Sequence, residues 1–431
     1  MIEQLSRTAT SGASAAATPP HTHIPALDGL RGLAILLVLY AHFTLAEPTN
    51  ALGIVERFYF RTAQLSWWGV DLFFVLSGFL ITGILFDAKQ KSHFFRNFYM
   101  RRVLRIFPLY YGLLVIAFWI VPLLVSPNPV GSTPGTVSSL WLWFYASNIG
   151  MSYYNSVLHF HDLFEFDHFW SLAVEEHFYF VWPFLVYAFR RKSLLWICGG
   201  IIAGALGLRL LLVGLDVHFM KRFVLTPCRM DALAMGALMA LLIRGDWEQT
   251  RLLKAARAVA LFGGLILLGT ILSNAYPEAL QHGKTWTPYF LQPAQPPGSD
   301  AMSWFLHAGL LSVLAPVFGA SLLLVISARR DSLTERFWTL SWLRFFGKYS
   351  YGIYVFHFAL IRYLRPWTDA ALARVSRLET HLPPLPAAVI SAPLFHSLLY
   401  FCLMTGLSVA VAWLSWHLYE KHFLKLKDRF V

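Results

Sequence analysis

Residues 27–46, LDGLRGLAILLVLYAHFTLA, form the stretch that decides the fold. This stretch is long and apolar enough to cross a bilayer, yet it contains Arg31 and His42. At about 100° and 1.5 Å per residue, their spacing places both side chains on one helix face, roughly 16 Å apart along the axis. One interpretation is a helix-packing histidine and an arginine that snorkels to the surface. Because ionisable groups inside a membrane are costly and histidine titrates near neutral pH, we instead predict a functional site.

The composition of the whole chain is that of a membrane protein. Of 431 residues, 57% are hydrophobic and only 13% are charged, whereas a soluble domain carries about 25% charged residues. The formal net charge of +12 is typical of cytoplasmic loops rich in lysine and arginine, so we expect no nucleic-acid partner. The three cysteines lie in apolar segments, and we expect no disulfide framework.

The hydropathy pattern predicts an all-α polytopic integral membrane protein, a bundle of about ten transmembrane helices. The expected spans cover approximately residues 27–46, 67–87, 104–125, 169–189, 194–214, 227–243, 256–273, 303–327, 349–365 and 391–417. Residues 139–150 are apolar but too short to cross, and we expect one re-entrant or interfacial segment there.

The loop charges predict the orientation of the bundle. With both termini in the cytoplasm, most lysines and arginines that flank the spans fall on the cytoplasmic side. Residues 1–24 are rich in Ser, Ala, Thr and Pro and lack the apolar core of a signal peptide, so we expect a disordered cytoplasmic tail. We expect residues 421–431 to form a basic cytoplasmic tail.

A basic cluster stands at the cytoplasmic start of the third expected span, in FYMRRVLRIFP (residues 98–108). Arg101, Arg102 and Arg105 are explained by positive-inside anchoring alone. The alternative is a phosphate site, because guanidinium groups match the geometry of phosphate oxygens. A phosphorylated cytosolic donor such as acyl-CoA would then bind at this position.

Two adjacent carboxylates lie at membrane depth in HFWSLAVEEHFY (residues 168–179). Helical spacing places His168, Ser171 and Glu175 on one face, so we favour Glu175 over Glu176 as the functional acid. Packing does not readily explain such a pair. A carboxylate near the first-span histidine would hold the tautomer of the imidazole and stabilise its charged form.

Other polar residues of the spans form a second tier of candidates. Asp71, at the outer start of the second span, is either a site residue or a helix N-terminal anion. Ser77 and Gly78 are expected to permit close helix packing. Arg229 and Asp231, at the start of the sixth span, are equally compatible with a structural ion pair and with substrate contact.

Two features concern histidines. His357, in the ninth span, is either a buried core residue or part of an acceptor path. The histidines and aspartates of residues 159–168 superficially resemble metal ligands. No second ligand group accompanies them in the sequence, so we expect no metal site.

Taken in order, these motifs resemble the membrane-bound acyltransferase-3 family of bacterial carbohydrate O-acyltransferases. The resemblance covers about residues 25–420. The matching stretches are LDGLRG (27–32) with His42, GVDLFFVLSGF (69–79), RRVLRIFP (101–108), WSLAVEEHFY (170–179), RMDAL (229–233) and SYGIY (350–354). One departure is His177, where the family usually has glutamine. Some members continue into a C-terminal SGNH esterase-like domain, which we do not expect here.

The resemblance implies transfer of an acyl group, usually acetyl, from cytoplasmic acyl-CoA to a carbohydrate hydroxyl. Acyl-CoA would be a co-substrate, with no tightly bound cofactor. In family terms His42 is catalytic within a motif shared with Arg31, and Arg101, Arg102 and Arg105 contact the donor. The implied setting is the bacterial inner membrane. The implied acceptor is a lipid-linked or polymeric glycan, such as lipopolysaccharide, exopolysaccharide or peptidoglycan, with polysaccharide-assembly proteins as candidate partners.

On this basis we expect His42 to act as general base and Glu175 to orient it, with Ser171 the first candidate carrier of an acyl-enzyme. The alternative from another class is a proton-coupled transporter or flippase that uses Arg31, His42 and Glu175 as a proton relay. The sequence shows no inverted-repeat pattern of the kind many transporters carry. Binding of CoA distinguishes the two functions.

Overall fold

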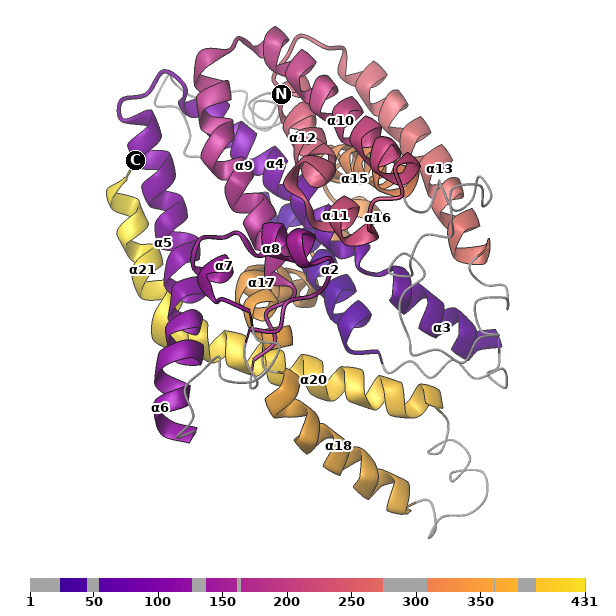
Figure 1. Cartoon of the computed structure of the whole chain (residues 1–431). Helices are drawn as coiled ribbons and strands as arrows, with labels where there is room; N and C mark the ends of the chain where they lie inside the picture. Colours follow the sequence, from indigo (N-terminus) through magenta and orange to yellow (C-terminus); the bar gives the residue numbers. More distant parts are fainter. Residues whose placement is uncertain are drawn as a thin grey trace.

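The computed structural model describes residues 24–44, 54–125, 137–160, 164–273, 308–359, 361–378 and 393–430. All regular structure within these ranges is helical, which confirms the predicted fold class (Figure 1). Of the N-terminal tail that we expected, all but Ile24 lies outside the described residues.

Five helices form the centre of the bundle and carry the candidate site. Helix α4 packs against α12 and α2, α17 packs along α2, and α9 packs against α4. These central helices are α2 (Pro25–His42), α4 (Trp68–Ala88), α9 (Phe169–Ala188), α12 (Thr226–Leu242) and α17 (Ser341–Ala359).

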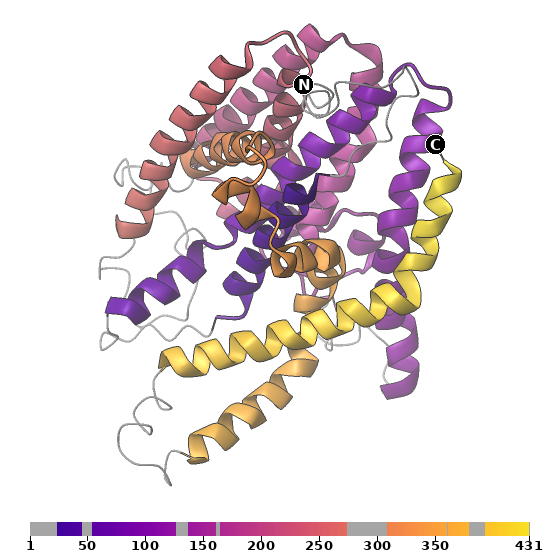
Figure 2. The ribbon, with the colours of Figure 1, turned by 180° about the vertical axis from the view of Figure 1, so that it is seen from behind.

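Longer helices flank this centre on two sides, and both views show them clearly (Figures 1 and 2). On one side lie α10 (Arg191–Gly214), α13 (Gln249–Ser273) and α15 (Leu310–Ile326). On the other side α5 (Phe94–Val115) continues through a π-helical turn, Ile116–Ile120, into α6 (Val121–Val125). The last long helix, α20 (Pro393–Ser415), continues through the π-helical turn η6 (Trp416–Glu420) into α21 (Lys421–Leu426), and α21 packs on α5.

The described chain is completed by α18 (Ile361–Leu378) and by shorter helices: α3 (Ile54–Leu65), α7 (Leu140–Trp143), α8 (Ser147–Tyr154), α11 (Phe219–Val224), α16 (Leu333–Trp338) and the single turn η7 (Lys427–Arg429). Helices α7 and α8 form the apolar segment near residues 139–150, and both are too short to cross a bilayer. Helices α18 and α20 pack together and project from the bundle (Figures 1 and 2).

By length and hydropathy, seven helices of the described residues are able to cross a membrane, where we expected about ten spans. They are Pro25–His42, Trp68–Ala88, Phe94–Leu124, Arg191–Gly214, Phe219–Leu242, Gln249–Ile271 and Pro393–Arg429. Helix α15 is apolar but shorter. Helices α9 and α17 fall where we expected spans, but they carry many polar residues of the candidate site.

Two predicted boundaries were wrong. The expected ninth span, residues 349–365, begins instead at Ser341 and ends at Ala359, and a separate helix follows it. The third begins at Phe94 rather than near residue 104. In both cases the first residues of the helix include basic side chains, among them Arg96 in α5 and Arg344 in α17, and a hydropathy pattern assigns such residues to a loop.

Glycines allow the central helices to approach at backbone distance. A Cβ built on Gly78 of α4 would lie 1.9 Å from the carbonyl oxygen of Leu233 in α12, which supports the packing role predicted for Gly78. Between α2 and α17, a Cβ on Gly32 would lie 2.0 Å from the Leu343 oxygen, and one on Gly347 1.9 Å from the Asp28 oxygen. Any side chain at these crossings would push apart the helices that carry the site.

We therefore predict that Gly78→Ala lowers the thermal unfolding midpoint of the purified protein in detergent. The added methyl group meets backbone rather than a movable side chain, and overpacking of this kind costs about 1–3 kcal/mol. Gly200→Ala in α10 is the matched control, because its Cβ would meet nothing within 4 Å. Equal midpoints for the two variants would contradict the close-packing role of Gly78.

Candidate active site

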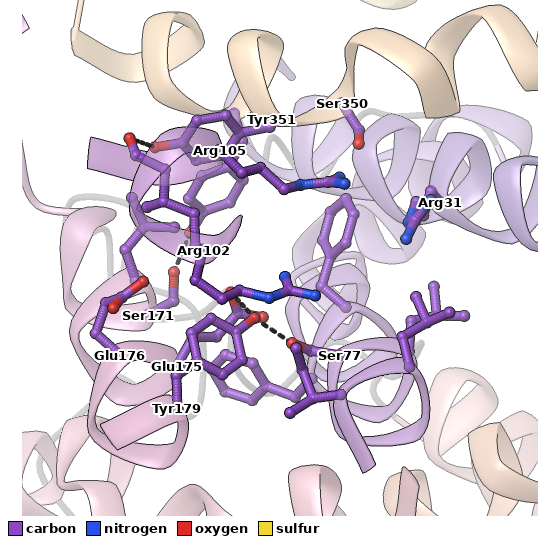
Figure 3. Close-up of a pocket in the computed structure, with 18 of the residues that line it drawn as sticks. Arg31, Ser77, Arg102, Arg105, Ser171, Glu175, Glu176, Tyr179, Ser350 and Tyr351 are labelled. Carbon is purple, nitrogen blue, oxygen red and sulfur yellow. Dashed lines mark hydrogen bonds between the residues drawn. The ribbon is translucent and has the colours of Figure 1, made fainter. Parts of the chain in front are cut away.

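Helices α2, α4, α5, α9 and α17 line a cavity of about 120 Å³, here called the inner cavity. The polar side chains that line it are Arg31, Ser77, Arg102, Arg105, Ser171, Glu175, Glu176, Tyr179, Ser350, Tyr351 and Tyr354. Figure 3 shows the guanidinium groups of Arg31, Arg102 and Arg105 turned toward one common space. The structure thus brings together the first, second, third, fourth and ninth predicted spans around one site.

A second, larger cavity of about 620 Å³, here called the basic cavity, adjoins the first. Arg31, Arg105 and Tyr351 line both cavities, so these three side chains mark the boundary between them. Arg344 and Lys348, one turn apart on α17, add two further positive charges. Asp28 and Glu420 are the acidic residues of its lining.

Of the predicted arginine cluster, Arg102 and Arg105 face the cavities and Arg101 lines neither. Arg102 lies with its guanidinium carbon 5.4 Å from the centre of the Tyr179 ring. All three arginines lie inside α5 rather than ahead of it, since that helix begins seven residues earlier, at Phe94.

Glu175 belongs to the inner cavity and not to the surroundings of His42. Tyr179 donates a hydrogen bond of 3.1 Å to the Glu175 carboxylate, and the Tyr179 hydroxyl is also hydrogen bonded to Ser77. The expected contact between Glu175 and His42 is absent from the described hydrogen bonds and ion pairs, so the structure does not support that pairing. The reason is depth: the α9 residue at the level of His42 is His168, two turns or about 10 Å earlier in the helix.

Three histidines from three helices form a cluster beyond the inner cavity. The ring of His357 lies 5.1 Å from that of His42 and 4.9 Å from that of His168, measured between centroids. The Nδ1 atom of His42 lies 3.3 Å from Nε2 of His357 and 2.9 Å from the Val38 carbonyl oxygen. His357 and His168 are buried, whereas His42 is partly exposed.

The inner cavity and the histidine cluster are separated by one layer of side chains. Ser171 and Tyr354, which line the inner cavity, both donate to the carbonyl oxygen of His168, at 3.1 and 3.0 Å. The two hydroxyl groups are also in hydrogen-bond contact with each other. Ser171, our first candidate acyl carrier, therefore lies at the boundary between the inner cavity and the histidine cluster.

Two buried ion pairs contribute no side chain to the lining of either cavity. Arg229 of α12 donates to both carboxylate oxygens of Asp71 at 3.0 Å, and Arg209 of α10 pairs with Asp231 at 2.6 Å. All four side chains are at most 3% exposed. Sequence neighbours Arg229 and Asp231 thus each pair with another helix, and the guanidinium of Arg229 also packs against four aromatic rings at 5.1–5.8 Å. This geometry favours the structural interpretation of Asp71, Arg229 and Asp231.

Sequence reasoning missed several of these residues. Arg344 and Lys348 were counted only as cytoplasmic anchors, and Tyr179 and Tyr354 were given no role. Arg209 carried a usable signal, because it is the one charged residue in the apolar stretch 193–215. In the described residues no group of His, Cys, Asp and Glu is arranged to hold a metal ion, and residues 161–163 of the suspected cluster lie outside them.

The fold and the two cavities define a multi-pass membrane protein with two adjoining cavities that are lined by several basic side chains. Residues 24–417 match the family model Acyl_transf_3, described as an acyltransferase domain. The chain therefore belongs to the acyltransferase-3 family, as its motifs indicated.

Curated relatives agree with this family. The chain is 29% identical over 367 residues to the peptidoglycan O-acetyltransferase OatA of Listeria monocytogenes, covering 80% of this chain and 50% of that protein. It is 30% identical over 381 residues to the putative peptidoglycan O-acetyltransferase YrhL of Bacillus subtilis, covering 80% and 49%. The putative O-acetyltransferase SACOL0978 of Staphylococcus aureus is 25% identical over 362 residues, covering 80% and 52%. The chain thus spans about half the length of the curated relatives it matches, and no solved structure matches it.

We predict that Asp71→Ala destabilises the protein by about 3–5 kcal/mol, because it leaves the Arg229 charge buried without its partner. The double variant Asp71→Leu with Arg229→Met removes both charges and should recover most of that loss. Thermal unfolding in detergent measures both effects. A stable Asp71→Ala protein that has lost binding of its substrate would instead place Asp71 in the active site.

Proposed function

We propose that this chain is a membrane O-acyltransferase that moves an acyl group, in the first instance acetyl, from cytoplasmic acyl-CoA to a carbohydrate hydroxyl. The observation that carries the proposal is the arrangement of the site along one path. The basic cavity and the inner cavity share Arg31, Arg105 and Tyr351, and Ser171 and Tyr354 of the inner cavity contact His168, which belongs to the same histidine cluster as His42. Family membership and the names of the relatives support the same reaction class.

The basic cavity suits the phosphorylated end of the donor. Arg31, Arg105, Arg344 and Lys348 supply four cations around one space, and arginine binds phosphate oxygens in bidentate fashion. The flexible pantetheine arm would run between Arg31 and Arg105 into the inner cavity. By the positive-inside rule this end faces the cytoplasm, which gives an inner-membrane protein with both termini on that side.

The reaction itself needs a base, and it needs hydrogen-bond donors that stabilise the negative charge developing on the thioester carbonyl oxygen. In our proposal His42 takes the proton of the acceptor hydroxyl, and the oxygen attacks the thioester carbonyl carbon. The new C–O bond forms, the C–S bond breaks, and the proton passes to the departing CoA thiolate. The hydroxyl groups of Ser171 and Tyr354 line the inner cavity and donate to the His168 carbonyl oxygen; in our proposal one of them turns to donate to the thioester carbonyl oxygen as it becomes negative.

Glu175 takes a different role from the one that we first expected. Its carboxylate accepts from Tyr179, and the Tyr179 ring lies under the Arg102 guanidinium. Together with Glu176, which also lines the inner cavity, Glu175 places negative charge close to Arg102 and Arg105. We propose that Glu175 holds Arg102 and Tyr179 in position for the donor.

The acceptor is proposed by class. The relatives at 29% and 30% identity carry names that specify peptidoglycan, so a peptidoglycan-type glycan is the first acceptor to test. Lipopolysaccharide and exopolysaccharide fractions are the next. The acceptor would approach the side of His42 that faces away from the basic cavity.

The primary test is thiol release from acetyl-CoA by the purified full chain in nanodiscs, with a crude cell-envelope glycan extract as acceptor. We expect release that depends on both the extract and His42, while His42→Ala still binds acetyl-CoA. His417→Ala is the matched histidine control, because His417 bonds the Trp413 carbonyl in the same way, while its ring contacts Tyr349 and Trp413 and not the histidine cluster. Normal acylation by His42→Ala would contradict the proposed base, and a wild-type protein that binds no acyl-CoA would contradict the donor.

We further predict that Arg105→Gln weakens acetyl-CoA binding about tenfold or more, since a charge-assisted hydrogen bond to phosphate contributes at least 1.4 kcal/mol, roughly tenfold in affinity. Arg101→Gln, four residues away on the same helix but outside both cavities, should change the affinity about threefold at most. Isothermal titration of the two variants with acetyl-CoA makes the comparison. Equal losses would show that general positive charge, rather than the basic cavity, attracts the donor.

A further inference from the structure

The histidine cluster contains a directional hydrogen-bond chain. His357 is fully buried in α17, and its Nδ1 atom lies 2.7 Å from the carbonyl oxygen of Tyr354. A carbonyl oxygen only accepts, so Nδ1 of His357 carries the hydrogen. In the neutral ring the Nε2 atom is then a lone-pair acceptor.

That acceptor faces His42. The distance from Nε2 of His357 to Nδ1 of His42 is 3.3 Å, and the same Nδ1 lies 2.9 Å from the Val38 carbonyl oxygen. Both neighbours accept, so the Nδ1 atom of His42 carries a hydrogen shared between them. The Nε2 atom of His42 is left as the lone pair that can remove a proton.

We propose that His357 is a positioning residue for this reaction: its neutral imidazole accepts from His42 Nδ1, orients the His42 ring and stabilises the charge that His42 gains. This inference rests on the proposed function. It assigns to a histidine the role that a carboxylate fills in a serine-hydrolase triad. The carboxylate that we expected there, Glu175, is engaged by Tyr179 in the inner cavity.

The surroundings of the cluster support a neutral partner. The rings that face His42 and His357 are those of Phe43, His168, Tyr354 and Phe358. None of these groups brings a negative charge, and no ion pair of the described residues includes either histidine. Among the described hydrogen bonds, the second acceptor of His42 Nδ1 is the uncharged ring of His357. The Val38 carbonyl alone fixes the tautomer, whereas two acceptors from two helices also fix the plane of the ring.

The kinetic test compares two substitutions at one position. Leucine removes the acceptor, while glutamine keeps a side-chain carbonyl that is able to accept from His42. We expect His357→Leu to lower kcat about 10- to 100-fold with the KM for acetyl-CoA unchanged, the range that corresponds to loss of one hydrogen bond to a charged group. We expect His357→Gln to recover at least about threefold of that loss. His417→Leu should behave as wild type.

Two kinetic outcomes would overturn the proposal. Wild-type kcat in His357→Leu would show that His42 needs no partner. Equal losses in the leucine and glutamine variants, with a raised KM, would show that His357 only packs.

A second measurement does not depend on activity. Nitrogen-15 NMR of histidine-labelled protein, assigned by loss of signals in His42→Gln and His357→Gln, reports which ring nitrogens carry hydrogen. We expect both rings with Nδ1 protonated and Nε2 unprotonated in the wild type. A His357 ring protonated at Nε2 would overturn the proposal even if no acyl transfer is found. An inactive wild-type protein with the expected tautomers would count against the proposed function and leave the positioning geometry confirmed.

Discussion

The site depends on two helix crossings at which backbone meets backbone. Where α4 crosses α12 and α2 crosses α17, hydrogen atoms of glycine stand where any other residue would place a side chain. Arg31 and His42 belong to α2. The residues of the site that belong to α17 include Arg344, Lys348, Tyr354 and His357. Because these two helices touch along their length, the basic end and the histidine end of the site are held at a fixed separation. The distance along α2 between Arg31 and His42 therefore sets the distance between the basic end and the histidine end of the site.

The charged side chains inside the bundle fall into two groups, those that form buried ion pairs and the arginines that line the cavities. The pairs Arg229–Asp71 and Arg209–Asp231 are buried, each joins two helices, and none of the four side chains lines a cavity. The arginines of the cavities are not neutralised in this manner. Arg31 forms an ion pair with Asp28 at 3.2 Å, while the Arg102 guanidinium packs against the ring of Tyr179. A membrane protein that leaves guanidinium groups with spare donors around a cavity retains the capacity to bind an anion there.

Some of this arrangement follows from sequence and some does not. Periodicity places Arg31 and His42 on one helix, and α2 runs through both as predicted. The apolar runs predict most long helices. They do not predict the first residues of α5 and α17, which include basic side chains. The partner of His42 could not be predicted, because it depends on which turn of α17 lies at the depth of His42. Likewise Arg344 and Lys348 look like ordinary cytoplasmic anchors until α17 is seen to line a cavity. Sequence patterns report the face of a helix, whereas the depth at which two helices meet is a property of packing.

The layer formed by Ser171 and Tyr354 has a consequence for the membrane itself. Two hydroxyl groups that share one carbonyl oxygen are all that stands between the inner cavity and the histidine cluster. A path that opened from both sides at once would conduct protons and small ions and would dissipate the gradient across the bilayer. In the proposed reaction the same layer would also shield the thioester from hydrolysis. Acyl transfer through such a site would have to occur across this layer, and the permeability of the membrane sets a limit on how far the layer can open.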